Sequence, residues 1–151
     1  MSFAGHLHTE NRNGLIVDAV LTAPSGTAER DAALALIRRQ KLKRGATLGA
    51  DKAYDTRAFV AALEERGLVP HIARNSSGRS SAVPDAVATT ADYAISQRRR
   101  KLVEEPFGWF KATAGCRKLR YIGVAANQHW FHMLAAGYNL IRLTKLTPTA
   151  A

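Results

Sequence analysis

The chain has 151 residues, 46% of them hydrophobic, which is enough for one domain with a real core and short for two. Lysine and arginine number 22 against 12 aspartates and glutamates, so the net charge of +10 predicts a polyanionic partner, most naturally nucleic acid. The single cysteine excludes an internal disulfide and a cysteine-based zinc site, and no signal peptide or membrane-spanning run is visible. We therefore expect a soluble, cytoplasmic protein without a membrane partner.

The N-terminal part of the chain predicts a β-hairpin followed by a helix. Residues 2–10 and 15–21 are rich in strand-compatible types and flank Asn13-Gly14, a pair that readily adopts positive φ. After a cap at Thr27, apolar residues recur at helical spacing at Ala32, Ala33, Leu36 and Ile37. Basic residues within 41–44 complement the C-terminal helix dipole before Gly45, which predicts a helix packed on a sheet.

The middle of the chain predicts a strand, a helix and a second strand. Residues 46–50 form a short apolar run ending at Asp51, Asp55 or Thr56 caps the helix, and residues 68–73 form the second strand. Connections this short make a βαβ unit, so the two strands should be parallel. Asp51 then lies at the carboxyl end of its strand, where open α/β sheets place their ligands. A helix cap or turn residue explains an Asp there equally well.

Residues 75–92 contain Ser, Gly, Pro and Thr with little periodicity and predict a mobile loop or insertion. A basic helix is expected to follow, and around its axis the side chains of Arg100, Glu104 and Lys111 lie at roughly 0°, 40° and 20°. The three side chains therefore share one narrow face, while Glu105 points away. A carboxylate held between two cations suits a site that handles phosphate and divalent metal. From geometry alone, a solvated face with ordinary ion pairs is the favoured interpretation.

The C-terminal part of the chain predicts a helix boundary and a core helix. Pro106 favours a kink or an early boundary in the basic helix, and a start at Glu105 would break the shared face. The final segment, residues 127–145, carries apolar residues at helical spacing that predict a core helix: Trp130, Phe131, Leu134, Tyr138 and Ile141.

Two motifs occur in a fixed order along the chain. Residues 49–55 read Gly-Ala-Asp-Lys-Ala-Tyr-Asp, and Arg100, Glu104 and Lys111 are separated by three and six residues. The pair resembles the bacterial insertion-sequence transposases of the DDE class, most closely insertion-sequence family five. The first motif matches the family's Gly-x-Asp-Lys-x-Tyr-Asp segment, and the second matches its Tyr-(2)-Arg-(3)-Glu-(6)-Lys signature, with Gln97 where the Tyr would be. The resemblance continues over nearly the whole chain, through residues 5–6, 10–15, 28–30, 70–71 and 138–140.

The resemblance implies an α/β fold, an RNase H-like mixed sheet with flanking helices that lacks its first strand. Residues 1–151 would be the C-terminal part of the transposase catalytic domain. Asp51 would be the second and Glu104 the third of the carboxylates that catalyse the reaction and hold two Mg²⁺ or Mn²⁺ ions. In the family the first Asp belongs to a strand that precedes the hairpin, so an upstream transposase segment would have to supply it.

The implied partner is double-stranded DNA, as transposon ends and as target, at the bacterial nucleoid. The expected DNA-binding residues are basic side chains that can contact phosphates: Arg98, Arg99, Arg100, Lys101, Lys111, Arg117, Lys118 and Arg120. Without the first strand a sheet edge is exposed, which favours association and leaves a homo-oligomer open.

Two functions from different classes remain. The first is DNA transposition by metal-dependent strand cleavage and transfer, inactive in this chain alone and active with an upstream segment, supplied as a separate chain or through translational frameshifting. The alternative is a non-catalytic DNA-binding remnant of a decayed insertion sequence, which retains only the basic surface. An overlapping upstream frame that encodes a strand with an Asp would favour the first.

Overall fold

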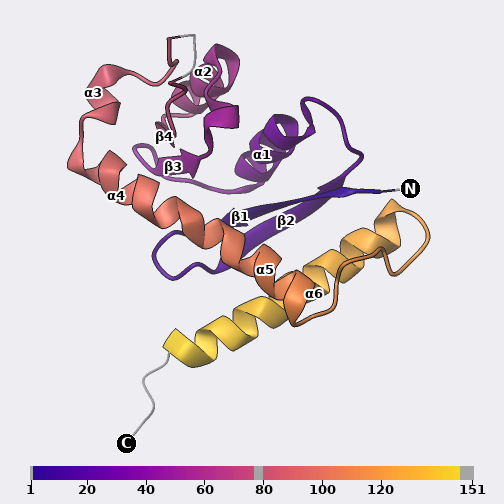
Figure 1. Ribbon diagram of the computed structural model, residues 1–151. Helices are drawn as coiled ribbons and strands as arrows, with labels where there is room; N and C mark the ends of the chain where they lie inside the picture. Colours follow the sequence, from indigo (N-terminus) through magenta and orange to yellow (C-terminus); the bar gives the residue numbers. More distant parts are fainter. Residues whose placement is uncertain (1, 77–79, 147–151) are drawn as a thin grey trace, which may run out of the picture. The chain divides into compact units, whose positions relative to one another are not determined.

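The computed structural model describes residues 2–76 and 80–146, which form a mixed α/β structure (Figure 1). The chain divides into two compact units, unit 1 with Met1–Ile37 and Leu102–Ala151, and unit 2 with Arg38–Lys101. The described strands form one antiparallel and one parallel two-stranded sheet. The predicted α/β class with mixed strand pairing is confirmed, and it is consistent with an RNase H-like domain. That both units make one domain stays a prediction.

The N-terminal hairpin is confirmed. Strands β1 (Ala4–Thr9) and β2 (Ile16–Thr22) pair antiparallel in unit 1. In the connection between them, Gly14 adopts a φ of 73°, which favours glycine, and the Glu10 carboxylate accepts the Asn13 N–H at 2.7 Å. The turn is therefore held by its own side chains.

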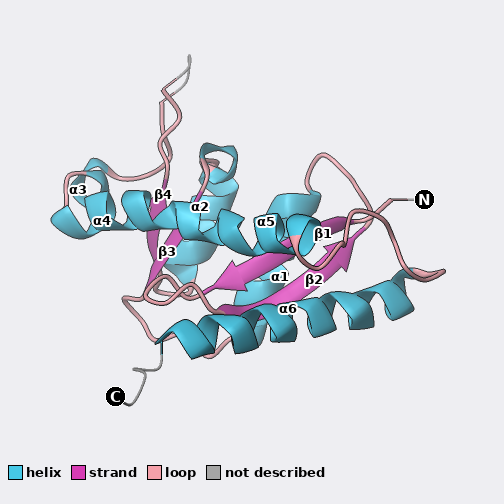
Figure 2. Ribbon diagram, turned by 60° about the horizontal axis from the view of Figure 1, so that its bottom comes forward, coloured by secondary structure: helices cyan, strands magenta, loops and turns pink. Residues whose placement is uncertain are grey.

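Helix α6 (Val124–Leu146) runs along the hairpin and buries its apolar face there (Figure 2). Its approach is close, because a Cβ at Gly5 would lie 2.9 Å from the Phe131 ring. Ile141 was predicted to be buried and is exposed, because at this end of α6 the residues that meet the hairpin are Asn139 and Arg142. One core cluster of unit 1 contains Ile16, Ala19, Phe110, Phe131, Leu134, Ala135 and Tyr138.

Helix α1 (Ala28–Arg39) lies on the opposite side of the hairpin from α6 (Figures 1 and 2). The prediction that this helix extends to Gly45 is wrong, since it ends at Arg39. After the buried Ile37, Leu42 is the only large apolar residue before Gly45, so a longer helix would have no apolar face to bury.

Unit 2 contains the predicted βαβ arrangement. Strands β3 (Thr47–Ala50) and β4 (Val69–Ile72) pair in parallel, and helix α2 (Arg57–Glu65) connects them. Of the two predicted caps, Thr56 is the one used, because its Oγ1 accepts the Phe59 N–H at 3.3 Å. The buried face of α2 consists of Phe59, Val60 and Leu63.

The segment predicted as a loop or insertion, residues 75–92, contains a short helix, α3 (Asp85–Ala88), and the first residues of α4 (Ala91–Arg99). Residues 77–79 of this segment lie outside the described residues. Its expected mobility therefore stays a prediction.

The basic helix predicted around Glu104 is divided at that residue. Residues Arg100–Val103 form a 3₁₀ turn, η2, and α5 (Glu104–Ala112) begins directly after it. A 3₁₀ turn rotates about 120° per residue, so the angles assigned to Arg100 and Glu104 on one α-helix are wrong. Pro106 lies in the first turn of α5, where its missing N–H leaves no helical bond unmade. The boundary that Pro106 predicted is confirmed.

Candidate active site

Asp51 lies directly after β3, at the carboxyl end of a parallel strand, as predicted. Its Oδ1 accepts the Lys52 N–H at 2.6 Å and caps the 3₁₀ helix η1 (Lys52–Tyr54). The Arg100 Nη1 lies 3.2 Å from the same oxygen. The Asp51 side chain is still 59% exposed, so this carboxylate combines a capping role with access from solvent.

Arg100 is positioned by contacts between α4 and β4, all of them within unit 2. The Gln97 amide donates to the His71 carbonyl at 2.7 Å, and the Tyr93 hydroxyl donates to the Ile72 carbonyl at 2.8 Å. Together these bonds hold the end of α4 against the strand and bring Arg100 to Asp51. Gln97, which replaces the Tyr of the signature, therefore has a structural role that no sequence pattern indicated.

His71 adds a buried contact to the same junction. Its Nδ1 lies 2.7 Å from the Ser96 Oγ, and both residues are buried. Burial lowers the pKa of the His71 imidazole, and the charge of Asp92 opposes this shift only in part. A neutral ring at neutral pH suits a structural hydrogen bond to a hydroxyl.

Glu104 and its neighbour Glu105 have different surroundings in unit 1. Glu104 is exposed at the start of α5 and forms no ion pair within residues 80–146. The Glu105 Oε2 pairs with the Arg142 Nη1 at 2.9 Å, and the Arg142 Nε donates to the Asn13 carbonyl at 2.6 Å. Glu105 thus connects α5 to α6 and to the hairpin, while Glu104 stays available. Lys111, two turns further along α5, is exposed on the same helix face as Glu104.

The two predicted catalytic carboxylates belong to different compact units, Asp51 to unit 2 and Glu104 to unit 1. That they share a divalent ion stays a prediction. Carboxylate oxygens are the ligands that Mg²⁺ prefers, so the donor chemistry of this pair fits the ion. Within the described parts of the chain, however, no three His, Cys, Asp or Glu side chains gather into a metal site. The pair alone is an incomplete ligand set.

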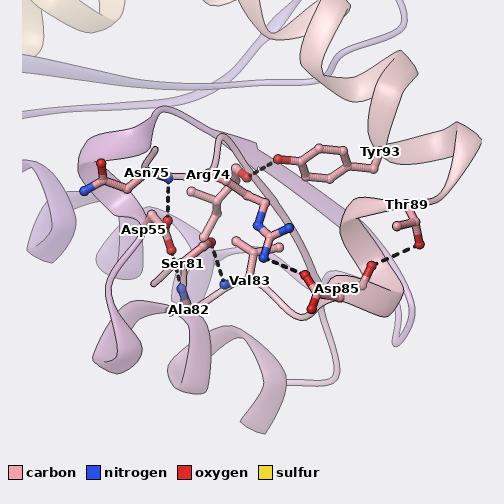
Figure 3. A network of polar contacts seen from close by, with 10 residues as sticks. Asp55, Arg74, Asn75, Ser81, Ala82, Val83, Asp85, Thr89 and Tyr93 are labelled. Carbon is pink, nitrogen blue, oxygen red and sulfur yellow. Dashed lines mark hydrogen bonds and ion pairs between the residues drawn. The ribbon is translucent and has the colours of Figure 1, made fainter. Parts of the chain in front are cut away.

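Asp55, the second Asp of the 49–55 motif, is a buried structural residue at 2% exposure. Its Oδ2 accepts the Asn75 N–H at 2.7 Å and its Oδ1 accepts the Ala82 N–H at 2.8 Å (Figure 3). The Asp55 carboxylate therefore holds the segment that precedes residues 77–79 close to the segment that follows them. The sequence did not indicate which Asp of the motif is buried, because both stand where a cap is expected.

The predicted DNA-binding residues are distributed over both units. Arg98, Arg99 and Lys101 are exposed at the end of α4 and in η2. Arg117, Lys118 and Arg120 are exposed in the connection between α5 and α6. Both sets are placed where they can meet phosphates, and DNA binding by either stays a prediction.

The family model for the transposase DDE domain matches residues 2–140 of this chain. Comparison with the curated proteins and with the solved structures gave no significant match. In the described ranges, no helix has the length and apolar character needed to cross a bilayer.

Proposed function

The chain belongs to the transposase DDE domain family, and from this premise we propose that it is the C-terminal part of an insertion-sequence transposase catalytic domain, of the family-five type. The proposed reaction is cleavage and transfer of DNA strands. Asp51 and Glu104 would supply two of three carboxylates, and an upstream segment would supply the first. The proposed place of action is the bacterial nucleoid in the cytoplasm.

The observation that carries this proposal is the surroundings of Asp51. An exposed carboxylate at the carboxyl end of a parallel strand, 3.2 Å from Arg100, combines a ligand for a cation with a group that can contact phosphate. The Arg100 side chain is 25% exposed, and its Nε is buried without a hydrogen-bond partner among the described residues. Both residues occupy motif positions of the family.

DDE transposase domains generally use divalent metal ions, and here we propose two ions, Mg²⁺ or Mn²⁺, held in part by Asp51 and Glu104. Such ions supply activation of water or a DNA 3′-hydroxyl and stabilisation of the leaving oxygen. The residues of this chain would bind and orient. Arg100 and Lys111 would hold phosphate oxygens close to the carboxylates, and the exposed basic residues would keep the duplex in register.

The two edges of the hairpin differ in a way that supports addition of an upstream strand. The outer edge of β2 is covered by α6, since Asn139 bonds both the N–H and the C=O of Ile16 at 2.8 Å. Gln128 accepts the Leu21 N–H at 2.7 Å, and the Ala19 carbonyl contacts the His132 Nε2 at 2.9 Å. These side chains take the place of a neighbouring strand.

Among the described residues, no side chain covers the edge of β1 in this way. In an antiparallel ladder, residues that point their backbone groups outward stand opposite one another. Ala19 pairs with Leu7, and Leu21 with Gly5, so the N–H and C=O groups of Leu7 and Gly5 point away from β2. No strand among the described residues pairs with this edge. An upstream strand added here would satisfy these groups and remove an edge that favours association.

Supplying an upstream transposase segment that carries the first Asp should restore Mg²⁺- or Mn²⁺-dependent strand cleavage to this chain. The reason is that a third carboxylate completes the ligand set and a strand covers the β1 edge. We would co-express the segment with the chain and measure cleavage of a labelled transposon end together with the fraction of protein in the supernatant. Both should rise together.

A matched control is the same segment with its Asp replaced by Asn. It should improve solubility without restoring cleavage. Cleavage by the chain alone in Mg²⁺ would contradict the proposal that it lacks a carboxylate.

The alternative is a non-catalytic DNA-binding remnant. It is favoured by the departure at Gln97 from the family signature. For both functions we predict that this chain binds duplex DNA with little sequence preference, and reconstituted cleavage separates them.

Binding of duplex DNA should weaken roughly a hundredfold between about 50 and 200 mM salt if about four phosphates are neutralised. Fluorescence anisotropy at several salt concentrations measures this. Replacing Arg117 and Lys118 by alanine should lower the slope of log K against log salt by about two, because each lost phosphate contact removes about one. Binding that does not respond to salt would exclude the basic surface as the site.

A further inference from the structure

The connection between α5 and α6 exposes an apolar side chain among cations. Ile122 is 100% exposed, while Arg117, Lys118 and Arg120 lie within five residues before it. Single exposed apolar residues are common on proteins, so exposure by itself indicates nothing. What distinguishes Ile122 is that the backbone around it is held rigidly.

Asn127 fixes the backbone on both sides of Ile122. This side chain is 2% exposed, and its Oδ1 accepts the N–H groups of Arg120 and Tyr121, both at 3.2 Å. Its Nδ2 donates to the Tyr121 carbonyl at 2.6 Å and to the Gly123 carbonyl at 2.7 Å. Gly123 has a φ of 86°, which makes the turn into α6.

Trp130 anchors the side chains that precede Ile122. The Arg120 guanidinium carbon lies 4.8 Å from the centre of the Trp130 ring, within the range of a cation–π contact. The Tyr121 ring meets Trp130 edge-on, with the ring centroids 6.4 Å apart. Asn127 and Trp130 lie one turn apart on α6, so one face of this helix holds Arg120 and Tyr121 while Ile122 remains in solvent.

The charge around Ile122 selects an anionic partner. From Pro106 to the end of the chain the sequence contains no Asp or Glu, whereas Lys111, Arg117, Lys118 and Arg120 all precede Ile122. Proteins that bind the minor groove of DNA combine such cations with an apolar wedge, often Ile or Leu, that enters between two base pairs. A protein surface offers carboxylates at irregular positions, whereas a duplex offers phosphates at regular intervals.

We propose that Ile122 is an apolar wedge that enters the minor groove of duplex DNA and partly unstacks a base step, while Arg117 and Lys118 contact the flanking phosphates. Asn127 is a positioning residue for the wedge. This inference rests on the proposed function, because it requires that the chain binds DNA. The inference goes beyond the proposed function because it assigns base unstacking to a single side chain.

The test uses the full chain and a short duplex that carries 2-aminopurine at a flexible TA step. Binding of the wild-type chain should raise the 2-aminopurine fluorescence, because the base loses its stacking partner. Ile122→Ala should abolish this rise and weaken binding only roughly three- to tenfold, with the salt slope unchanged. Ile122→Leu should retain the rise. Leu140→Ala, which truncates another exposed apolar residue of the same unit, should match the wild type.

Several outcomes would overturn the wedge. DNA binding without a fluorescence rise, or a rise that survives Ile122→Ala, excludes it. Loss of self-association or of upstream-segment binding in Ile122→Ala, with DNA binding unaltered, would identify Ile122 as a protein contact instead. A fluorescence rise that depends on Ile122 in a chain that never cleaves DNA, even with the upstream segment, would support the wedge while the proposed catalytic function fails.

Discussion

Asp51→Asn and Glu104→Gln should each abolish DNA strand cleavage by the chain reconstituted with its upstream segment. Each substitution replaces a carboxylate that we propose binds metal by a neutral amide of nearly the same shape. Loss of such a ligand removes several kcal/mol of transition-state stabilisation, and about 4 kcal/mol corresponds to roughly a 10³-fold slower reaction. We would measure single-turnover cleavage of a labelled transposon end with saturating protein and Mg²⁺.

The fold should survive both substitutions. Asp51 is 59% exposed, so loss of its ion pair with Arg100 should cost about 1 kcal/mol or less in unfolding free energy. DNA affinity should fall little, because neither carboxylate neutralises a phosphate.

Glu105→Gln is the matched control for Glu104→Gln. Glu105 is the adjacent carboxylate, of the same type and on the same helix, and its partner is Arg142 at 2.9 Å. This variant should lose a little stability and keep its cleavage rate. Equal loss in the Glu104 and Glu105 variants would argue that α5 matters only through its packing, and full activity in Asp51→Asn would exclude Asp51 from the active site.

Asp55→Ala should destabilise unit 2 by roughly 3 kcal/mol. The substitution leaves the backbone N–H groups of Asn75 and Ala82 without their acceptor, and an unsatisfied donor costs about 1–3 kcal/mol when it is shielded from water. Partial hydration of this surface segment keeps the sum below the maximum for two donors. Asp55→Asn, which retains one acceptor oxygen, should cost about half as much.

Urea denaturation followed by circular dichroism would measure this difference. Asp85→Ala is the control, because Asp85 lies in the same segment and forms an ion pair with Arg74 at 2.7 Å (Figure 3). The Asp85 side chain, however, is 84% exposed. Its loss should cost less than about 1 kcal/mol. If Asp55→Ala and Asp85→Ala unfold at the same urea concentration, the buried carboxylate does not hold the segment together.

The elements predicted correctly are those with strong local signals. The hairpin depends on two strand-forming runs around Asn13-Gly14, and the parallel pair β3–β4 depends on a short helix between two apolar runs. Helix α6 depends on apolar spacing that a sequence shows directly. In each case the residues that determine the element lie within the element or next to it.

The errors have a common physical origin. The end of α1, the 3₁₀ turn before Glu104 and the exposure of Ile141 all depend on where a helix meets or leaves a surface that other segments provide. Periodicity records which face is apolar and does not record how far the partner surface extends.

The candidate site shows the same division. Residue types and their spacing were enough to predict the family, the acidic residue at the end of β3 and the basic character of the segments around Glu104. Three further distinctions became visible in the folded chain: Asp55 is buried while Asp51 is open, Glu105 rather than Glu104 pairs with Arg142, and Asn127 holds Ile122 in solvent. Those distinctions arise from hydrogen bonds and ion pairs between residues that belong to different elements, and a single sequence carries no record of which polar groups meet.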